Sequence, residues 1–420
     1  MKFIYLFCLV NKMMQQETQQ DKIVPLVIKN EDEEDQVVTP WKAETKSGKF
    51  NYKRLIEQFG VEEINEELLD RFKKVTGHDP HPWMKRGLFF AHRQLGEILD
   101  DYEKGKPIFL YTGRGPTSEA LHLGHIIPFM FTKWLQDVFD AVVVIQMADD
   151  EKYYFKDMSF DHIYKLGFEN AKDIIAVGFN PEKTFIFSNR DYLENHHYIK
   201  VIADFMKYVK INQINATFGI PDSGCVGQMI WPVYQSAAAF SASFKDIFGA
   251  DNIKCLVAYA IDQDPYFRLC RDVAPRLGFH KPCAIMTQFL PALEGNAKMS
   301  STANTGPVST IFMTDSKEQI KDKIMKYAYS GGGDTIKEHR EKGANLTVDV
   351  SYQYLKYFEF DDAKLEDIAN KYASGQMLTS EIKTYLVDKV TSLVESHNVK
   401  KSSVTPDTLK YFYDLTKFKH

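Results

Sequence analysis

Two short segments of the sequence combine residue types that can hold a triphosphate. The first, residues 111–125, follows a short apolar run and contains a glycine-rich turn, then His122, Gly124 and His125. A helix that begins here would present unpaired N–H groups and a partial positive charge, which both favour phosphate. The two histidines share one helical face and could stabilise charge that develops on phosphate oxygens. Gly124 has no side chain, so a flat base could lie against the backbone.

The second segment, residues 295–301, places Lys298, Met299 and Ser300 on a loop of small residues. A lysine ammonium is a flexible point charge, which suits a group that must follow charge moving along a triphosphate. Each segment alone has an ordinary explanation, because the histidine pair fits a polar helix cap and the lysine segment fits a solvated loop. A metal site is a third interpretation of the histidines, although no acidic or cysteine ligand stands near them in the sequence.

Alternating strand and helix patterns surround the first segment. The predicted strands are 107–111, 142–145, 185–187, 255–258 and 284–286, and the predicted helices are 123–139 and 160–177. This alternation predicts an α/β fold with a parallel sheet covered on both faces. Ligands of such sheets bind at the carboxyl ends of the strands, where the first segment would lie.

The pattern becomes helical after about residue 306. Helical spacing covers 316–329, 351–373 and 379–398, and glycines at 331–333 and 375 interrupt it. We therefore expect four parts. Residues 1–37 would form a mobile, charge-rich tail, and residues 38–306 an N-terminal extension with a parallel-sheet domain. Residues 307–402 would form an all-helical domain, and residues 403–420 a C-terminal segment that returns to the sheet domain.

Composition limits the class of protein. The formal net charge of -5 over 420 residues argues against a general nucleic-acid binder but allows a local basic face. None of the five cysteines stands in a C-x-x-C pair, so we expect reduced thiols and neither a zinc site nor a disulfide framework. The apolar run at 3–10 is too short for a bilayer, which needs about 20 residues. We expect a cytoplasmic protein without a membrane span; a signal peptide, or a true start at Met13 or Met14, are the two explanations open for the run.

The two segments resemble the signature sequences of class I aminoacyl-tRNA synthetases, usually written HIGH and KMSKS. Longer stretches at 111–139, 146–152 and 262–268 resemble eukaryotic cytoplasmic tryptophanyl-tRNA synthetases, and the resemblance runs from about residue 40 to the C-terminus. It implies a Rossmann-type catalytic domain followed by an all-helical anticodon-binding domain, and a homodimer. It also implies a tryptophan–tRNA ligase that uses ATP, carries Mg²⁺ only on the ATP phosphates, and loads tRNA(Trp).

In that reaction the tryptophan carboxylate attacks the α-phosphate of ATP to give tryptophanyl-adenylate, so no side chain has to act as a nucleophile. Catalysis is then mainly positioning and charge stabilisation. The resemblance implies one set of residues that act on the phosphates: His122, His125, Arg114, Lys298 and Ser300. It implies a second set that binds the rest of ATP: Thr112, Gly113, Gly124, Asp262 and Met299.

The resemblance also implies a tryptophan pocket, which would consist of Tyr111, Gln146, Glu151, Lys152, Gln235 and Gln263. Tyr111 and Gln146 would meet the indole N–H, and Glu151 would meet the substrate ammonium. An indole N–H only donates, so the pocket needs an acceptor at that point. Phenylalanine would leave the acceptor unpaired, which can support discrimination of roughly 10⁴–10⁵.

Two positions depart from the family pattern. Ala148 stands where the family often has threonine, which removes one hydroxyl near the adenylate. Gly333 stands where close relatives have arginine, a strong reader of base edges, in a stretch that resembles an anticodon-reading loop. The neighbouring Asp334 could still accept from a cytosine amino group. The alternative for this stretch is a flexible loop between helices.

Three other functions fit parts of the same pattern. A tyrosine–tRNA ligase shares the fold and both signatures, and Tyr111 could serve either substrate. A binding module that has lost catalysis would keep the fold, although the histidines, Lys298 and Ser300 are all present. A nucleotidylyltransferase would share the histidine pair and the sheet, but such enzymes usually lack a helical C-terminal domain of this size.

Overall fold

The computed structural model describes residues 36–40, 43–45, 50–295, 298–299 and 309–418. The described part begins with a small antiparallel sheet of β1 (Gln36–Val38) and β2 (Ala43–Thr45). The expected tail at 1–37 lies outside the described residues except for its last two positions. Gln36 and Val37 belong to β1, because their backbone pairs with β2.

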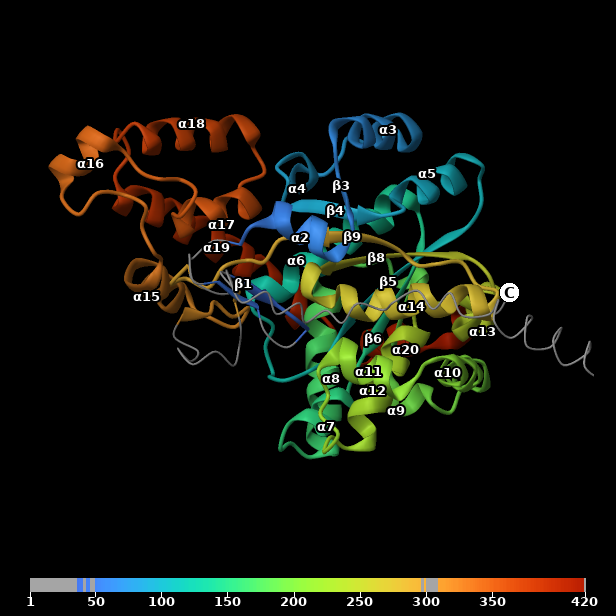
Figure 1. Cartoon of the computed structure of the whole chain (residues 1–420). Helices are drawn as coiled ribbons and strands as arrows, with labels where there is room; N and C mark the ends of the chain where they lie inside the picture. The colour runs from blue at the N-terminus through green and yellow to red at the C-terminus, as the bar shows by residue number, and fades with distance from the viewer. Residues whose placement is uncertain (1–35, 41–42, 46–49, 296–297, 300–308, 419–420) are drawn as a thin grey trace, which may run out of the picture.

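A seven-stranded sheet lies at the centre of the described structure (Figure 1). Its order in space is β3-β4-β9-β8-β5-β6-β7. The neighbours from β9 to β7 run parallel, and β3 and β4 extend one edge by antiparallel pairing. The predicted parallel sheet is confirmed. The strands are β3 (Glu62–Glu63), β4 (Phe89–Arg93), β5 (Ile108–Arg114), β6 (Val142–Met147), β7 (Thr184–Ser188), β8 (Lys254–Ala260) and β9 (Cys283–Thr287).

The two antiparallel edge strands were not predicted. β4 is a short apolar run that ends in His92 and Arg93, and a run of this length fits a strand or part of a buried helix equally well. Its pairing with β9, interrupted by an irregularity between Phe89 and Ala91, makes it a strand. That pairing joins segments far apart in the chain, so local sequence does not reveal it.

Alternate residues of the central strands pack on opposite faces of the sheet, as the two-residue period of a strand requires. Leu110 and Val143 belong to one core cluster, and Phe109 and Val144 to the other. The first cluster includes side chains of α3 (Glu66–Thr76), α5 (Leu95–Glu103), α6 (Leu123–Phe139) and α8 (Phe160–Ala176). The second includes α2 (Tyr52–Phe59), α10 (His196–Tyr208), α12 (Val226–Ala237) and α14 (Asp264–Leu277). Shorter helices connect these elements: α4 (Pro82–Lys85), α7 (Glu151–Phe155), α9 (Asn189–Tyr192), α11 (Ile211–Phe218) and α13 (Lys245–Phe248).

The order in which successive strands are added to the sheet reverses at β5. After β5 the chain adds β6 and β7 on one side, and it then returns to add β8 and β9 on the other side. Such a switch point leaves a crevice outside the carboxyl ends of the strands, where open α/β sheets bind ligands. The carboxyl ends of β5, β6 and β8 meet at this crevice.

Helices follow the sheet, as the sequence predicts. They are α15 (Lys317–Tyr327), α16 (Ile336–Lys342), α17 (Val350–Phe358), α18 (Asp362–Ala373), α19 (Thr379–Ser402) and α20 (Pro406–Tyr413). The helical spacing at 351–373 corresponds to two helices, because the chain turns between α17 and α18. The side chain of Asp361 accepts from the backbone of Lys364 and so starts the second helix. Helix α16 was not predicted.

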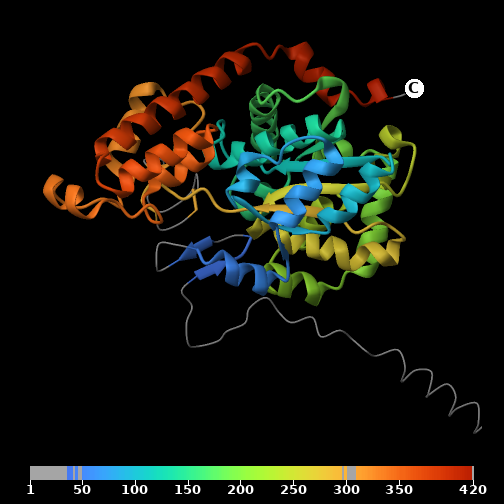
Figure 2. The same cartoon turned by 90° about the horizontal axis from the view of Figure 1, so that it is seen from above.

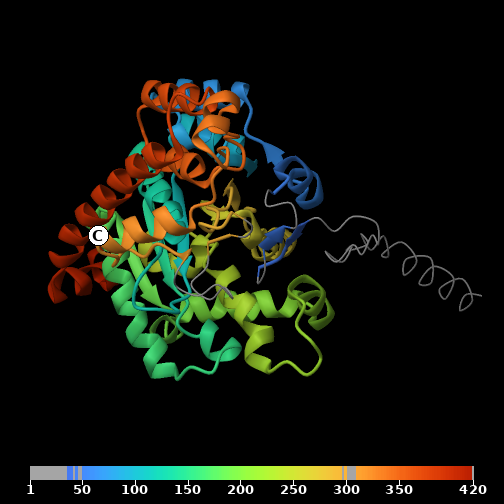
Figure 3. The same ribbon diagram turned by 90° about the vertical axis from the view of Figure 1, so that its left-hand side faces the viewer.

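The long helix α19 runs from the helical region back along the sheet-containing body (Figures 2 and 3). Its last turns bind a buried acid of α8. Asp173 lies 3.0 Å from His397 Nε2 and 2.9 Å from Lys401 Nζ. Beyond α19, α20 packs near β7, and Lys417 Nζ donates to the carbonyl of Thr184 at 2.7 Å. We propose on these contacts that 307–402 and 403–420 are separate parts that both dock on the sheet-containing domain.

Replacing Asp173 should loosen this docking. Asp173→Asn keeps the size of the side chain but removes the charge that faces His397 and Lys401, so we expect a loss of about 1–3 kcal/mol of stability. Thermal unfolding and limited proteolysis between the sheet and the helical region measure the effect. Asp161→Asn is the control, because its ion pair with Arg190 is largely exposed. An unchanged melting temperature and cleavage pattern for Asp173→Asn would contradict the assignment.

Among the described residues, no helix combines the length and the apolar character that a bilayer crossing requires. Four cysteines of the described residues form no disulfide; Cys255, Cys270 and Cys283 are buried, and Cys225 is exposed.

Candidate active site

A cavity of about 660 Å³ opens at the switch point, within the range of ~300–1,000 Å³ typical of small-molecule sites. Every residue predicted to bind ATP or tryptophan, or to act on the phosphates, lines it, apart from Ser300, which lies outside the described residues. These lining residues are Tyr111, Thr112, Gly113, Arg114, His122, Gly124, His125, Gln146, Glu151, Lys152, Gln235, Asp262, Gln263, Lys298 and Met299. The fold therefore gathers residues that stand far apart in the sequence.

Tyr111 and Gln146 form a buried polar pair in the cavity wall, with exposures of 2% and 1%. The Tyr111 hydroxyl donates to Gln146 Oε1 at 2.5 Å and lies 3.2 Å from the carbonyl oxygen of Gln235. Burial raises the pKa of Tyr111 well above its usual value, so the hydroxyl keeps its proton. Because this proton points to Gln146, the phenolic oxygen can only accept from a group in the cavity.

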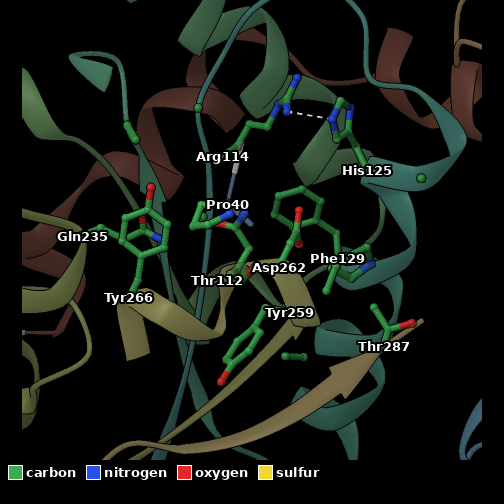
Figure 4. Close-up of a pocket in the computed structure, with 18 of the residues that line it drawn as sticks. Pro40, Thr112, Arg114, His125, Phe129, Gln235, Tyr259, Asp262, Tyr266 and Thr287 are labelled. Carbon is green, nitrogen blue, oxygen red and sulfur yellow. Dashed lines mark hydrogen bonds between the residues drawn. The ribbon is translucent and has the colours of Figure 1, made fainter. Parts of the chain in front are cut away.

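Arg114 and His125 face each other at another part of the wall (Figure 4). Arg114 Nη1 lies 3.0 Å from His125 Nε2. A guanidinium only donates, so Nε2 must accept and the ring proton sits on Nδ1. The backbone nitrogen of His122 also lies 3.4 Å from that Nδ1. We assign the tautomer of His125 from its shorter contact, the one with Arg114. A protonated Nδ1 cannot accept from the backbone nitrogen of His122, so the 3.4 Å contact is not a hydrogen bond in this tautomer.

Both signature histidines are neutral at pH 7. Burial, and next the charge of Arg114, lower the pKa of His122 and of His125 well below the usual value. The Nδ1 of His122 is buried and has no hydrogen-bond partner among the described residues. Each ring thus presents N–H and lone-pair sites rather than a positive charge, and the positive charge of this wall comes from Arg114.

Arg114 is held by neighbours on two elements. Its Nε donates to Asn170 Oδ1 of α8 at 3.1 Å, and the Nδ2 of Asn170 donates to the carbonyl of Ser118 at 2.7 Å. Burial lowers the pKa of Arg114 to about 10, while the charges of Glu151 and Asp173 oppose the shift. The guanidinium remains a cation at neutral pH, fixed at the end of β5.

Lys298 reaches the cavity from the second signature segment. Its ammonium forms an ion pair with Asp262 at 2.5 Å and lies 5.8 Å from the ring centre of Phe289. The backbone of Met299 donates to Leu290 at 2.9 Å, which ties the segment to the end of the sheet. Lys298, which is expected to act on the phosphates, and Asp262, which is expected to bind another part of ATP, thus contact each other. The assigned roles require that this ion pair open when ATP binds.

The two signature segments touch at Gly124. A Cβ atom at this position would lie 3.1 Å from His122 Cε1 and 3.6 Å from the Cβ of Met299. Glycine therefore lets the start of α6, the histidine ring and the lysine segment approach one another closely.

Glu151 is 7% exposed at the start of α7, and its Oε1 accepts from Lys152 Nζ at 2.5 Å. Its other oxygen lies against Gly115, where a Cβ atom would stand only 2.1 Å away. The backbone of Gly115 is not in the left-handed region. Glycine is needed here because of the space that the carboxylate occupies, and not because of backbone conformation.

Comparison with known proteins places this site in a family. Residues 103–395 match the family described as class I tRNA synthetases for tryptophan and tyrosine. The cytoplasmic tryptophan–tRNA ligase of Oryctolagus cuniculus is 50% identical over 385 residues, which cover 91% of this chain and 80% of that protein. The chain belongs to the tryptophanyl-tRNA synthetases of class I. The cytoplasmic tryptophan–tRNA ligase of Dictyostelium discoideum is 45% identical over 389 residues, which cover 91% of this chain and 96% of that protein.

A solved structure of the same family agrees with the fold. The tryptophanyl-tRNA synthetase of Encephalitozoon cuniculi, crystallised with tryptophan, matches with a TM-score of 0.81 and 38% identity over 88% of this chain and 99% of that chain. The family and the fold class inferred from the two signatures are therefore confirmed.

Several lining residues of this synthetase were not predicted: Pro40, Lys156, Trp231, Tyr266 and Phe289. They come from separate parts of the chain, and their residue types are those of ordinary loops and cores. Figure 4 shows Pro40 and Tyr266 among the site residues although the sequence separates them widely. No local pattern marks such residues. Ala148, where the resemblance leads one to expect threonine, also lines the cavity and is buried.

The proposed anticodon residue lies elsewhere. Asp334 is exposed in the connection between α15 and α16, and it does not line the cavity. A Cβ atom at Gly333 would stand 2.8 Å from the backbone nitrogen of His339, too close for a side chain without movement of the helix start. Glycine therefore fits the close backbone approach at position 333, and the neighbouring Asp334 is exposed.

Among the described residues, no group of three His, Cys, Asp or Glu side chains could hold a metal ion. The two carboxylates that line the cavity, Glu151 and Asp262, are each paired with a lysine. These donors do not fit a metal held by the protein itself.

Proposed function

We infer that the chain is a tryptophan–tRNA ligase, which joins L-tryptophan to tRNA(Trp) in two steps that consume ATP. The observation that carries this function is the Tyr111–Gln146 pair, which offers a buried acceptor in the same cavity as Arg114, the two signature histidines and Lys298. The relatives named above are tryptophan–tRNA ligases, and their cytoplasmic designation agrees with the location expected from the sequence.

Tryptophan is recognised at both of its ends. The phenolic oxygen of Tyr111 accepts from the indole N–H, because its own proton is donated to Gln146. One carboxylate oxygen of Glu151 accepts from the substrate ammonium, and the other oxygen of Glu151 accepts from Lys152 Nζ. A phenylalanine side chain would leave the buried oxygen unpaired, and a tyrosine side chain would bring its hydroxyl to a different point of the pocket.

Adenylate formation rests on position and charge. The carboxylate of tryptophan attacks the α-phosphate, and pyrophosphate leaves. Arg114 and Lys298 supply positive charge to the phosphates, the neutral His122 can supply an N–H donor, and the neutral His125 accepts from Arg114 and so holds the guanidinium in place. Mg²⁺ would arrive bound to ATP and neutralise phosphate charge, because the carboxylates of the cavity are engaged with lysines.

The helical region is proposed to bind the anticodon end of tRNA(Trp), with Asp334 accepting from a cytosine amino group. Asp334 is exposed and does not line the cavity, which suits that role. Binding of an anticodon stem-loop to Asp334→Ala tests the assignment, and unchanged affinity would remove Asp334 from the interface.

A homodimer is proposed, and exposed apolar side chains on three consecutive helices are candidates for its interface. Ile199 and Met206 of α10, Ile211 of α11 and Val226 of α12 are large, apolar and exposed. Their burial against a second copy would remove apolar area from water. Sedimentation measurements decide the state, and a monomer at micromolar concentration would contradict the proposal.

Amino-acid-dependent exchange of pyrophosphate into ATP, measured with all twenty amino acids, tests the function. We expect L-tryptophan to drive exchange and L-phenylalanine to be discriminated by roughly 10⁴–10⁵. Faster exchange with L-tyrosine would establish the tyrosine enzyme instead. No exchange with any amino acid, from folded protein, would establish a binding module without catalysis.

A further inference from the structure

The Tyr111–Gln146 pair continues into the protein as a line of hydrogen bonds that the reaction itself does not use. Gln146 Nε2 donates to Asn189 Oδ1 at 2.7 Å, and Asn189 Nδ2 donates to Asp150 Oδ1 at 2.8 Å. All four side chains are at most 2% exposed. We call Tyr111, Gln146, Asn189 and Asp150 the polar relay.

The direction of each hydrogen bond in the polar relay follows from the next residue inward. An ionised Asp150 only accepts, so Asn189 must turn its NH₂ group toward it. The carbonyl oxygen of Asn189 then faces Gln146 and accepts from its NH₂ group. The amide oxygen of Gln146 is consequently left to accept from the hydroxyl of Tyr111.

Neighbouring contacts agree with this direction. The hydroxyl of Tyr198 donates to the carbonyl of Tyr234 at 2.8 Å, so its oxygen can accept from Gln146 Nε2 at 3.2 Å. The carbonyl oxygen of Tyr234 lies 3.3 Å from the same nitrogen. The distances from Gln146 Nε2 to these two acceptors are longer than its distance to Asn189 Oδ1. Asn189 is therefore the principal group that orients the Gln146 amide.

We propose that Asp150 and Asn189 are specificity-determining positioning residues, which orient the Gln146 amide so that Tyr111 presents an acceptor to the indole N–H. Neither residue lines the cavity. They act through Gln146, and their contribution therefore concerns the choice between substrates with and without a ring N–H. This inference rests on the proposed function, because it assumes that an indole occupies the pocket.

Asp150 also has an unused oxygen. Its Oδ2 is buried and has no hydrogen-bond partner among the described residues. Burial raises the pKa of Asp150 to about 7. Once protonated, the group can donate to Asn189 as well as accept from it, so the direction of the relay is no longer fixed. Recognition of the indole N–H should weaken as the pH falls through this pKa.

Other titratable groups surround Asp150. Asp149 and Glu151 flank it in the chain, and Tyr154 of α7, Tyr198 of α10 and Tyr234 of α12 face it. Burial raises the pKa of each of these tyrosines, so they stay neutral near pH 7. Burial also raises the pKa of Asp149 to about 6, and this neighbour must be separated from Asp150 in any pH experiment.

The test compares tryptophan with β-(3-benzothienyl)alanine, in which sulfur replaces the ring N–H. The measured quantity is the ratio of kcat/KM for the two amino acids in pyrophosphate exchange by the full chain. Asn189→Leu removes the acceptor that faces Gln146 at similar side-chain size, and we expect it to lower the ratio by about 10- to 100-fold. A folded Asn189→Leu protein with an unchanged ratio would overturn the proposal.

A double variant and a pH series keep the test decisive if Asn189→Leu does not fold. Asp150→Asn combined with Asn189→Asp reverses the bond between the two positions but keeps an acceptor facing Gln146, so the ratio should stay within about threefold of the starting protein. In the unaltered protein the ratio should fall as the pH is lowered from about 8 to about 6. Asp149→Asn should retain that pH dependence, because Asp149 bonds Ser188 and the backbone of Arg190 rather than the relay.

A flat pH series in the unaltered protein, or a ratio that falls in the double variant as it does in Asn189→Leu, would each overturn the role of the relay. These results differ from failure of the proposed function. If the unaltered protein does not exchange pyrophosphate with tryptophan at all, the function is wrong; if it does and the ratio stays constant, only the relay is wrong.

Discussion

Lys298→Ala is expected to slow tryptophan-dependent pyrophosphate exchange by roughly 10²–10³ while the protein stays folded, as for loss of one preorganised charge donor in other enzymes. The side chain of Lys298 is 26% exposed, and its ammonium pairs with Asp262 in the cavity that Arg114 and the histidines also line. Without Lys298, the negative charge that develops on the leaving pyrophosphate loses one stabilising positive charge. The loss should appear mainly in kcat, because the lysine is needed most in the transition state.

The chain contains a closely matched control. Lys323 also pairs with a buried acid, Asp315, at 2.6 Å and also lies near a phenylalanine ring, at 5.2 Å from that of Phe312. It does not line the cavity. Lys323→Ala should therefore exchange pyrophosphate at close to the starting rate. An exchange rate for Lys298→Ala equal to that of Lys323→Ala would remove Lys298 from the mechanism.

Gly115→Ala is expected to raise the KM for tryptophan by about 10- to 100-fold, which corresponds to loss of a charge-assisted hydrogen bond. The added methyl group would stand 2.1 Å from the free oxygen of Glu151. That oxygen ends a flexible side chain, so the carboxylate can move aside at little cost in stability. The movement takes it away from the substrate ammonium, and recognition of tryptophan weakens while the KM for ATP remains.

Two comparisons isolate this effect. Gly167→Ala adds a methyl group in helix α8 with no neighbour within 4 Å, so it should leave both KM values as they are. Indole-3-propionate lacks the amino group, and its inhibition constant should be the same for Gly115→Ala and the unaltered protein. If inhibition by indole-3-propionate weakens as much as tryptophan binding does, the methyl group closes the indole pocket instead of displacing Glu151.

Local patterns predicted much of the framework. The helix expected at 123–139 is α6 with the same bounds, and the five predicted parallel strands are present with ends shifted by a few residues. These elements were predictable because a buried strand or helix has to carry apolar residues at a fixed period. The turn between α17 and α18 was missed, because the capping side chain of Asp361 interrupts a continuous apolar pattern.

The resemblance to a family supplied the site residues, and the fold places all the described ones that were assigned to ATP or tryptophan around one cavity. A list of such residues does not show which of them are in contact. Lys298 pairs with Asp262, and the proton of His125 is assigned only through its contact with Arg114. Both contacts join segments that approach through the sheet, so they depend on the whole topology.

By itself the sequence determined the α/β class and the helical C-terminal region, and it singled out the two segments proposed to bind phosphate, because residue type and spacing act over one or two turns of chain. The tertiary structure alone decided that Gly115 must make room for Glu151, that α19 docks on Asp173, and that Asn189 and Asp150 stand behind Gln146. Those relations join residues from different strands and helices. Hydrogen-bond direction and steric exclusion act over a few ångströms in space, and only the packed sheet brings these groups that close.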